Sequence, residues 1–276
     1  MRIHYFILIL FFIIVDFIFA QPIHSWFNSE LNIKPFSANF YEPRAGTSFN
    51  LNGRFLRLDI GTTQDFFTIQ DSSITYSFGA DLFTYTRLRS ENDFKFPVET
   101  IDYFFGINIG LKKLISDGNY GLRFRLSHVS AHLVDGLYDG QNTQWRNGLS
   151  PFVFSKEFIE LFPFYQYKNL RAYLGLTYIF HVIPDVIGKG IYQLGFDYYL
   201  TQLSFGDFTP LAAVDYKISS TSEYNGNIIA AVGVKFGKVN SKGFSLLFTY
   251  YNGKGIHAEF FNQDEIYSTI GFNVDL

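Results

Sequence analysis

Residues 120–135 read YGLRFRLSHVSAHLVD, and their character alternates with a period of two. Four apolar side chains share one face of an extended strand: Tyr120, Leu122, Phe124 and Leu126. The opposite face carries Gly121, Arg123, Arg125 and Ser127. The same count places His128, Ser130 and His132 on the apolar face. Polar groups are unexpected there unless they act at an apolar boundary, so the nature of the boundary decides how they are interpreted.

The same alternation recurs along most of the chain. Segments with one apolar face and one face of polar residues and glycine cover 74–83, 101–112, 170–182, 192–201, 228–236, 244–250 and 266–276. Strands of about ten residues with this pattern are typical of outer-membrane barrels, whereas strands of soluble β-sandwiches usually have about five or six residues. Closure also removes the exposed edges of such strands. The pattern predicts an all-β fold, a closed antiparallel transmembrane β-barrel.

The composition agrees with a membrane barrel. Aromatic residues make up 20% of the 276 residues, with 34 Phe and 19 Tyr, and only 17% are charged. The chain has no Cys, so an exported protein of this length must be held together by a large packed or closed architecture. The formal charge of −3 gives no electrostatic footprint for nucleic acid. Outer-membrane lipid is the expected partner.

The N-terminus has the features of a secretory signal peptide. Arg2 is basic, residues 6–15 form an unbroken apolar run, and Ala20 is a small residue at a cleavage point. We therefore expect a signal peptide over 1–20, a periplasmic lead-in over 21–39 and the barrel over 40–276. Such a chain would be exported to the outer membrane of a Gram-negative bacterium and inserted by the barrel-assembly machinery.

The lengths of the links predict the strand count and direction. Short links fall at 70–73, 116–119, 165–169, 204–208 and 238–242. Longer or more irregular links alternate with them, at 89–97, 134–150, 183–189, 219–225 and 252–264. Barrels of this kind have short periplasmic turns and longer outer loops, so a first strand near 44–51 predicts twelve strands with every long link outside. His128, Ser130 and His132 then lie at the outer rim of the fifth strand and face lipid.

A His-x-Ser pair on a strand places an imidazole and a hydroxyl two residues apart on the same face. His128 could take the proton of Ser130 and make it a nucleophile, and at an apolar boundary this pair would meet lipid ester bonds. A third group must orient the histidine. The candidates in the next link and strand are Asp135, Asp139, Asn142 and Glu157.

This arrangement resembles that of outer-membrane phospholipase A and the lipid A deacylases, where an Asn or Glu follows twelve residues after the serine of a lipid-facing His-x-Ser pair. His128 and Ser130 match the pair, and Asn142 falls at the twelfth residue. The resemblance is confined to residues 128–142. It implies a lipid-ester hydrolase with Ser130 as nucleophile, His128 as base, and Asn142 or Glu157 as the orienting group.

A broader resemblance covers most of the mature chain. Four segments are similar to landmarks of an uncharacterised bacterial family, a domain of unknown function expected to form outer-membrane barrels: KPFSANFYEPRAG at 34–46, SHVSAHLVD at 127–135, FSKE at 154–157 and GKGIHAEFF at 253–261. The chain departs from the pattern of that family at Ala131, Lys156, Ile256 and Ala258. The resemblance implies the barrel and the importance of these positions, and it implies no activity.

Non-catalytic interpretations remain open. A β-bulge before the rim would turn His128 and Ser130 away from lipid and leave a structural cluster with His132 and Asp135. Charged residues with inward parity would fill the lumen with ion pairs: Arg44, Asp81, Asp102, Lys112, Arg123, Arg125, Glu157, Arg171 and Asp197. The protein would then be a structural barrel or a narrow channel with a polar, largely filled lumen.

The last histidine, His257, falls in the final outer link. A surface position is the first expectation for it, and a place in the structural polar cluster with Arg44, Arg123, Arg125, His132 and Asp135 is the alternative. His128, His132 and His257 could instead converge on a metal. Asp135 and Asp139 could bind calcium near lipid head groups. No other cofactor is expected.

Overall fold

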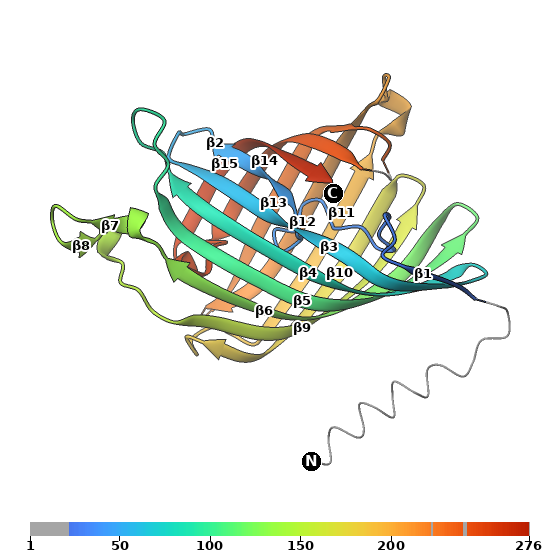
Figure 1. Ribbon diagram of the computed structural model, residues 1–276, viewed down its shortest axis with the longest axis horizontal. Helices are drawn as coiled ribbons and strands as arrows, with labels where there is room; N and C mark the ends of the chain where they lie inside the picture. The colour runs from blue at the N-terminus through green and yellow to red at the C-terminus, as the bar shows by residue number, and fades with distance from the viewer. Residues whose placement is uncertain (1–21, 222, 240–241, 276) are drawn as a thin grey trace, which may run out of the picture.

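The computed structural model describes residues 22–221, 223–239 and 242–275, which form a closed antiparallel barrel of twelve strands (Figure 1). The wall strands are β2 (Ala45–Asn50), β3 (Phe55–Asp71), β4 (Ile74–Arg89), β5 (Val98–Ile115), β6 (Gly118–Leu133), β9 (Phe154–Tyr167), β10 (Leu170–Ile183), β11 (Gly190–Tyr199), β12 (Phe208–Thr221), β13 (Glu223–Phe236), β14 (Gly243–Lys254) and β15 (Asp264–Asp275). β2 pairs with both β15 and β3, which closes the sheet. The predicted all-β barrel is confirmed. The predicted signal peptide lies outside the described residues.

Each wall strand has one face inside the barrel and one outside. On β10, Tyr173 and Ile179 are buried inside, whereas Leu174 and Tyr178 are about half exposed outside. Other large apolar side chains share this exposed position: Leu82, Phe105, Ile107, Ile109, Leu126, Leu194, Leu246, Phe248 and Ile270. An outer surface this apolar suits contact with lipid. Separately, no helix in the described ranges is long and apolar enough to cross a membrane.

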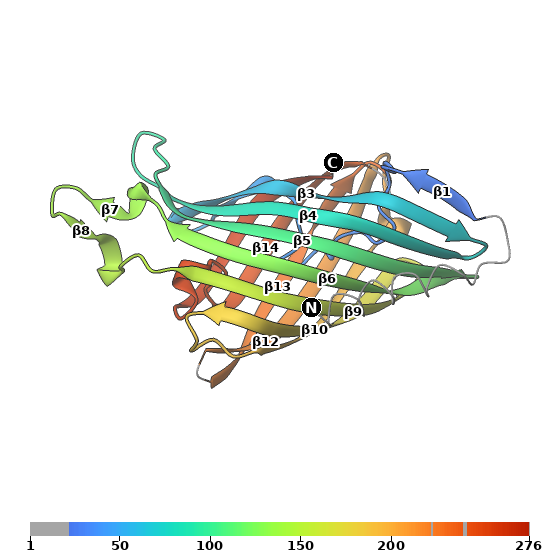
Figure 2. The same ribbon diagram turned by 60° about the horizontal axis from the view of Figure 1, so that its bottom comes forward.

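The two ends of the barrel differ in their links. At the short-turn end, residues 72–73, 116–117 and 168–169 join neighbouring strands, and the other links there are 200–207, with η3 (Thr201–Leu203), and 237–242. At the long-loop end, the link 134–153 contains η1 (Asp135–Leu137), β7 (Tyr138–Asp139), β8 (Gln144–Trp145) and η2 (Arg146–Gly148), and the link 255–263 contains η4 (Ala258–Phe260). Figure 2 shows β7 and β8 projecting at this end. The alternation of short and long links agrees with the prediction at most positions.

One predicted link is wrong. The polar residues 219–225 were expected to form a long outer link, but β12 continues to Thr221 and β13 begins at Glu223. Ser219 pairs with Asn225 and Ser220 with Tyr224, so the strands remain hydrogen-bonded almost to the hairpin tip. Polar side chains here belong to strand ends that extend beyond the apolar surface, and composition alone does not distinguish such ends from a loop.

The N-terminal segment enters the lumen, which corrects the expected periplasmic lead-in over 21–39. β1 (Ile23–Trp26) pairs with residues 67–70 of β3, and β2 pairs with residues 56–59 on the same edge of that strand. Between them the chain leaves the wall (Figure 1). Phe36, Asn39 and Glu42 are at most 1% exposed, because they lie among inward-facing side chains of the wall. We call residues 27–44 the lumenal segment.

Wall side chains on several strands hold the lumenal segment. Arg123 of β6 pairs with Glu42, with Nη1 3.0 Å from Oε2 and a second contact from Nη2 to Oε1. Lys217 of β12 donates to Oδ1 of Asn39 at 3.0 Å. Further wall donors to this segment are Lys112, Arg125, Lys156 and Arg171. The segment therefore fills the lumen and is bonded to it on several sides.

The buried pair predicts a large effect on stability. Glu42→Ala is expected to destabilise the barrel by about 3–5 kcal/mol, because it leaves Arg123 buried without its counter-ion; the two side chains are 1% and 3% exposed. Urea unfolding in detergent measures the loss. The matched control is Glu91→Ala, whose side chain is 40% exposed beside Arg89 and should change stability by at most about 1 kcal/mol. Equal losses would contradict the structural role of the pair.

Candidate active site

Strands β6, β9 and β10 bring a polar cluster together on the outer face of the barrel, near the long-loop end. His128 lies opposite Glu157, which lies opposite His181. Nδ1 of His128 is 2.6 Å from Oε1 of Glu157, and Nδ1 of His181 is hydrogen-bonded to Oε2 of the same carboxylate. Ser155 donates to Oε1 at 2.7 Å, and Ser130 lies opposite Ser155. We call these five residues the rim cluster.

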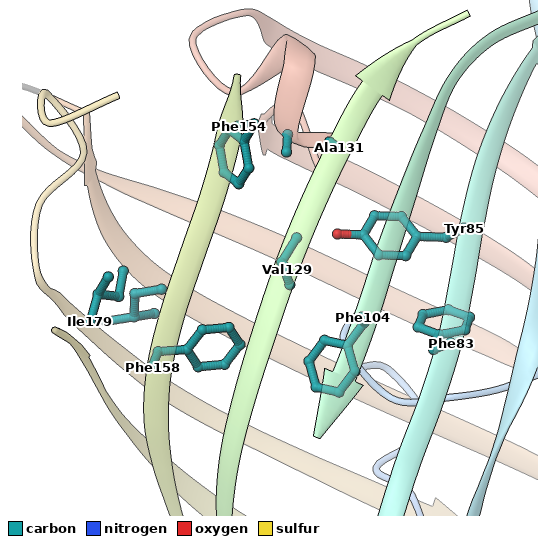
Figure 3. Close-up of a cluster of buried hydrophobic side chains, with 10 residues drawn as sticks. Phe83, Tyr85, Phe104, Val129, Ala131, Phe154, Phe158 and Ile179 are labelled. Carbon is teal, nitrogen blue, oxygen red and sulfur yellow. The ribbon is translucent and has the colours of Figure 1, made fainter. Parts of the chain in front are cut away.

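The neighbours of His128 and Ser130 fix their outward direction. Val129 and Ala131 are fully buried inside the barrel, and Figure 3 shows them among the aromatic side chains of a hydrophobic cluster. Because side chains alternate along a strand, His128 and Ser130 point outside, as the parity of the sequence predicts. The side chain of His128 is 38% exposed, and its ring stacks on Phe105 with the centroids 6.3 Å apart.

His132 lies on the same outer face, so its predicted place in the structural polar cluster is wrong. It is exposed, and its ring packs edge-on against Tyr103 with the centroids 6.2 Å apart. The bulge that would have turned His128 and Ser130 inward is absent from the described part of β6, which keeps one register with β9 from Gly118 to Ala131.

A bulge occurs instead in β10 and supplies a residue that the sequence pattern missed. Simple alternation places His181 inside together with Ile179. The register of β10 with β9 shifts between these two residues, so Phe180 and His181 both lie outside while Val182 packs inside. Bulges commonly redirect a side chain in this way. The alternating sequence around His181 contains no signal for the shift.

Glu157 faces outside, so its predicted inward parity is wrong. Along β9 the inner face is formed by Phe154, Lys156 and Phe158. The alternation on β9 is set by Lys156, which faces inward although it is charged. Lys156 is buried, with Nζ 2.8 Å from the hydroxyl of Tyr41 in the lumenal segment. Because Lys156 faces inward and side chains alternate along β9, Glu157 faces outward beside His128.

Two other predicted partners lie away from the rim cluster. Asn142 is in the turn between β7 and β8, where Nδ2 is 2.9 Å from Oδ2 of Asp139, so its expected role beside His128 is wrong. Hydrogen bonds from Asn142 hold the pKa of Asp139 below its usual range. Asp135 is exposed in η1 and not part of a lumenal cluster. The register of β6 with β9 places Glu157 beside His128. The spacing of twelve residues from Ser130 to Asn142 does not predict this neighbour.

His257 is buried, which corrects its expected surface position. The link 255–263 folds into the mouth of the barrel, and Nδ1 of His257 is 2.7 Å from Oδ2 of Asp102. His257 lies inside while His128 and His132 lie outside, so these histidines do not converge on a metal. No group of three or more His, Cys, Asp or Glu that could hold a metal occurs in the described ranges.

The three arginines of the predicted structural cluster lie in or line the lumen. Arg44 donates to the carbonyl of Asn39 at 2.5 Å, and Arg125 is 2.6 Å from Oε2 of Glu160. Arg123 pairs with Glu42, as described above. These residues brace the lumenal segment and have no contact with the rim cluster across the wall.

The rim cluster has the parts of a nucleophilic site. When Glu157 accepts the Nδ1–H of His128, the basic lone pair of the imidazole lies on Nε2. The hydroxyl of Ser130 lies two residues from His128 on the same face of β6. A hydroxyl, an imidazole and an acid on two paired strands constitute the usual set for activating a serine.

Comparison with known proteins places the chain in a family. A family model described as "Protein of unknown function (DUF1207)" matches residues 43–275. The chain belongs to this family. The predicted membership of an uncharacterised family of barrels is thereby confirmed. No curated protein matches the chain.

Several solved structures share a barrel fold with this member of the family. The translocator domain of autotransporter NalP from Neisseria meningitidis is 13% identical, with 84% of this chain and 85% of that chain covered and a TM-score of 0.37. The beta domain of the Bordetella autotransporter BrkA is 14% identical, with 84% and 96% covered and a TM-score of 0.37. The outer membrane protein OpdK from Pseudomonas aeruginosa is 10% identical, with 81% and 77% covered and a TM-score of 0.33.

Proposed function

We propose that this protein is a lipid-ester hydrolase of the outer membrane, with Ser130 as nucleophile, His128 as general base and Glu157 as the orienting acid. The observation that carries the proposal is the bond of 2.6 Å between His128 and Glu157 on the outer face of the wall. Below the pair on β6, Leu122 and Leu126 are 38% and 41% exposed. These exposed leucines support a position of the pair beside lipid, and the proposal places the pair at the level of the lipid ester bonds.

The proposed reaction uses the hydroxyl of Ser130, the imidazole of His128 and the carboxylate of Glu157. Nε2 of His128 takes the hydroxyl proton as Oγ of Ser130 attacks the ester carbonyl carbon, and Glu157 stabilises the imidazolium. Collapse of the tetrahedral intermediate breaks the carbonyl carbon–alkoxy oxygen bond, and the leaving alcohol receives the proton from Nε2. Water then attacks the acyl-Ser130 ester, again giving a proton to Nε2, and the fatty acid leaves as Ser130 regains its hydrogen.

Release of fatty acid tests the proposal directly. Purified, refolded protein is incubated with phospholipid or lipopolysaccharide in mixed micelles, with and without calcium. We expect release that is abolished in Ser130→Ala and retained in Ser155→Ala, because Ser155 bonds to the acid and not to the base. No release under any of these conditions would overturn the proposal.

The proposal requires the long-loop end to face the cell exterior. The chain has no Cys, so single cysteines can be labelled cleanly. Asn142→Cys, in the exposed β7–β8 turn, is expected to react with a membrane-impermeant maleimide on intact cells. Asp117→Cys, in the exposed β5–β6 turn, should react only after lysis. The reverse pattern would place the rim cluster at the inner leaflet.

The second candidate function is a non-catalytic, non-conducting barrel. It is favoured by the bonds of Glu157 to His128, His181 and Ser155, which join three neighbouring strands. In that case Glu157→Gln would lower the unfolding temperature of the barrel. Neither the parent protein nor any variant would release fatty acid. A filled lumen is common to both candidates, and neither is an open channel.

A further inference from the structure

The link between β6 and β9 leaves the wall next to the rim cluster. The pairing of these two strands ends at Ala131, one residue after Ser130. Within the link, β7 and β8 form a small hairpin in which Tyr138 lies opposite Trp145. Figures 1 and 2 both show this hairpin extending beyond the barrel wall. We call residues 134–153 the arm.

The base of the arm is fixed to the barrel. Nη1 of Arg89 donates to the carbonyl of Gly136 at 2.6 Å, and the backbone N–H of Val134 donates to the carbonyl of Glu99 at 2.9 Å. Leu137, the residue before the hairpin, is fully buried. These contacts hold the hairpin in a defined position relative to the rim cluster.

The tip of the arm is also ordered by its own bonds. Oδ1 of Asp139 accepts the backbone N–H groups of Gln141 and Asn142 at 3.1 and 3.3 Å. Nη1 of Arg146 is 3.6 Å from Oδ2 of the same carboxylate, so the two charges offset each other. A ligand at the tip would meet a surface that needs little further ordering, which favours binding.

The side chains at the tip combine aromatic rings with uncharged amides. Tyr138 is 40% exposed, and its ring lies edge-on to Trp145 with the centroids 5.5 Å apart. The exposed residues around them are Gln141, Asn142, Thr143, Gln144 and Asn147. Aromatic faces pack on the C–H faces of sugars, and each amide offers both donors and an acceptor to hydroxyl groups. Acyl chains would leave those amides unpaired, which is costly.

We infer that the arm binds the saccharide head group of a glycolipid and so selects saccharide-headed lipids for the rim cluster. The inference rests on the proposed function for the ester chemistry. Figures 1 and 2 show the hairpin beyond the end of the wall strands, so a ligand that joins the hairpin to the rim cluster must extend away from the wall. Several linked sugars can extend in this way, whereas a head group of one phosphate and one ethanolamine is short.

Binding tests the inference independently of catalysis. In a Ser130→Ala background, the affinity for fluorescent lipopolysaccharide in detergent micelles is compared with that for fluorescent phosphatidylethanolamine. Tyr138→Ala combined with Trp145→Ala is expected to weaken lipopolysaccharide binding roughly tenfold and leave phosphatidylethanolamine binding unchanged. Tyr224→Ala is the matched control, because this tyrosine is 62% exposed on β13, away from the arm. It should change neither affinity.

Two further measurements test the inference. Core oligosaccharide freed from its lipid should compete with lipopolysaccharide for the unmodified arm and not for the double variant. In the protein that keeps Ser130 and hydrolyses lipid, the combined Tyr138→Ala and Trp145→Ala replacement should raise KM for lipopolysaccharide without changing kcat. Unchanged lipopolysaccharide affinity, an equal loss for both lipids, or failure of the free oligosaccharide to compete would each overturn the inference. Because binding is measured without turnover, absence of hydrolysis alone would overturn only the proposed function.

Discussion

His128→Ala is expected to lower kcat/KM for release of fatty acid by roughly 10³–10⁴-fold. His128 and His132 each lie two residues from Ser130 on the outer face of β6, and His128 is the one whose Nδ1 is bonded to Glu157, which leaves its Nε2 as the base. Glu157→Gln should lose at least roughly 10²-fold, because an amide cannot stabilise the imidazolium as a carboxylate does. Initial rates on one lipid substrate over a range of concentrations measure both losses.

The matched control for this series is His132→Ala. His132 is the next histidine on the same outer face of β6, and it packs against Tyr103 without a bond to Glu157. Its replacement should leave kcat/KM within about twofold. Similar losses for His128→Ala and His132→Ala would show that the outer face of β6 matters for folding or lipid contact, and the catalytic role of His128 would be lost.

Shortening the lumenal segment is expected to convert a silent barrel into a conducting one. β1 ends with Trp26 opposite Phe67 of β3, and the pairing of β2 with β3 starts with Gly46 opposite Asp59. Along β3 these two pairings are separated by residues 60–66, whereas residues 27–45 connect β1 to β2. A linker of about six residues would let β1 and β2 continue as one strand, given a rise of about 3.3 Å per residue. Planar-bilayer recordings should show steady single-channel steps for this variant and none for the parent.

Two further variants make the conductance result decisive. Deletion of residues 138–145 shortens the chain outside the lumen and should remain silent. The triple replacement of Arg123, Arg171 and Lys217 by Ala keeps the chain length and removes wall donors to the lumenal segment, so it should give intermittent steps. Folding of each variant is checked by heat-modifiable mobility in gels. A folded shortened variant that stays silent would contradict a lumen closed by residues 27–44.

The barrel could be predicted from the sequence because its strands obey a simple period. On β6 the alternation of Leu126 outside and Arg125 inside follows directly from contact with lipid on one face and a polar interior on the other. The lumenal segment obeys no period. Phe36 and Phe40 are buried inside the barrel, but the sequence around them resembles an unpatterned leader, since its contacts come from distant strands.

The candidate site could be predicted only in part. His128 and Ser130 follow from the parity of one strand, whereas Glu157 and His181 depend on how three strands align. Glu157 faces outward because the neighbouring Lys156 is buried inside the barrel. His181 faces outward because of a local bulge in β10. Asn142 was favoured by its spacing, yet the arm that contains it leaves the wall altogether. Register and bulges arise from pairing between strands, and a single sequence does not display them.

The most direct test of the proposed chemistry is to locate the reactive serine. Refolded protein in lipid micelles is treated with a fluorophosphonate probe, which forms a stable bond to an activated serine, and the modified peptide is identified by mass spectrometry. We predict modification at Ser130 that disappears in His128→Ala and persists in His132→Ala and Ser155→Ala. Modification at Ser155, or modification of Ser130 that is unaffected by loss of His128, would contradict the assignment.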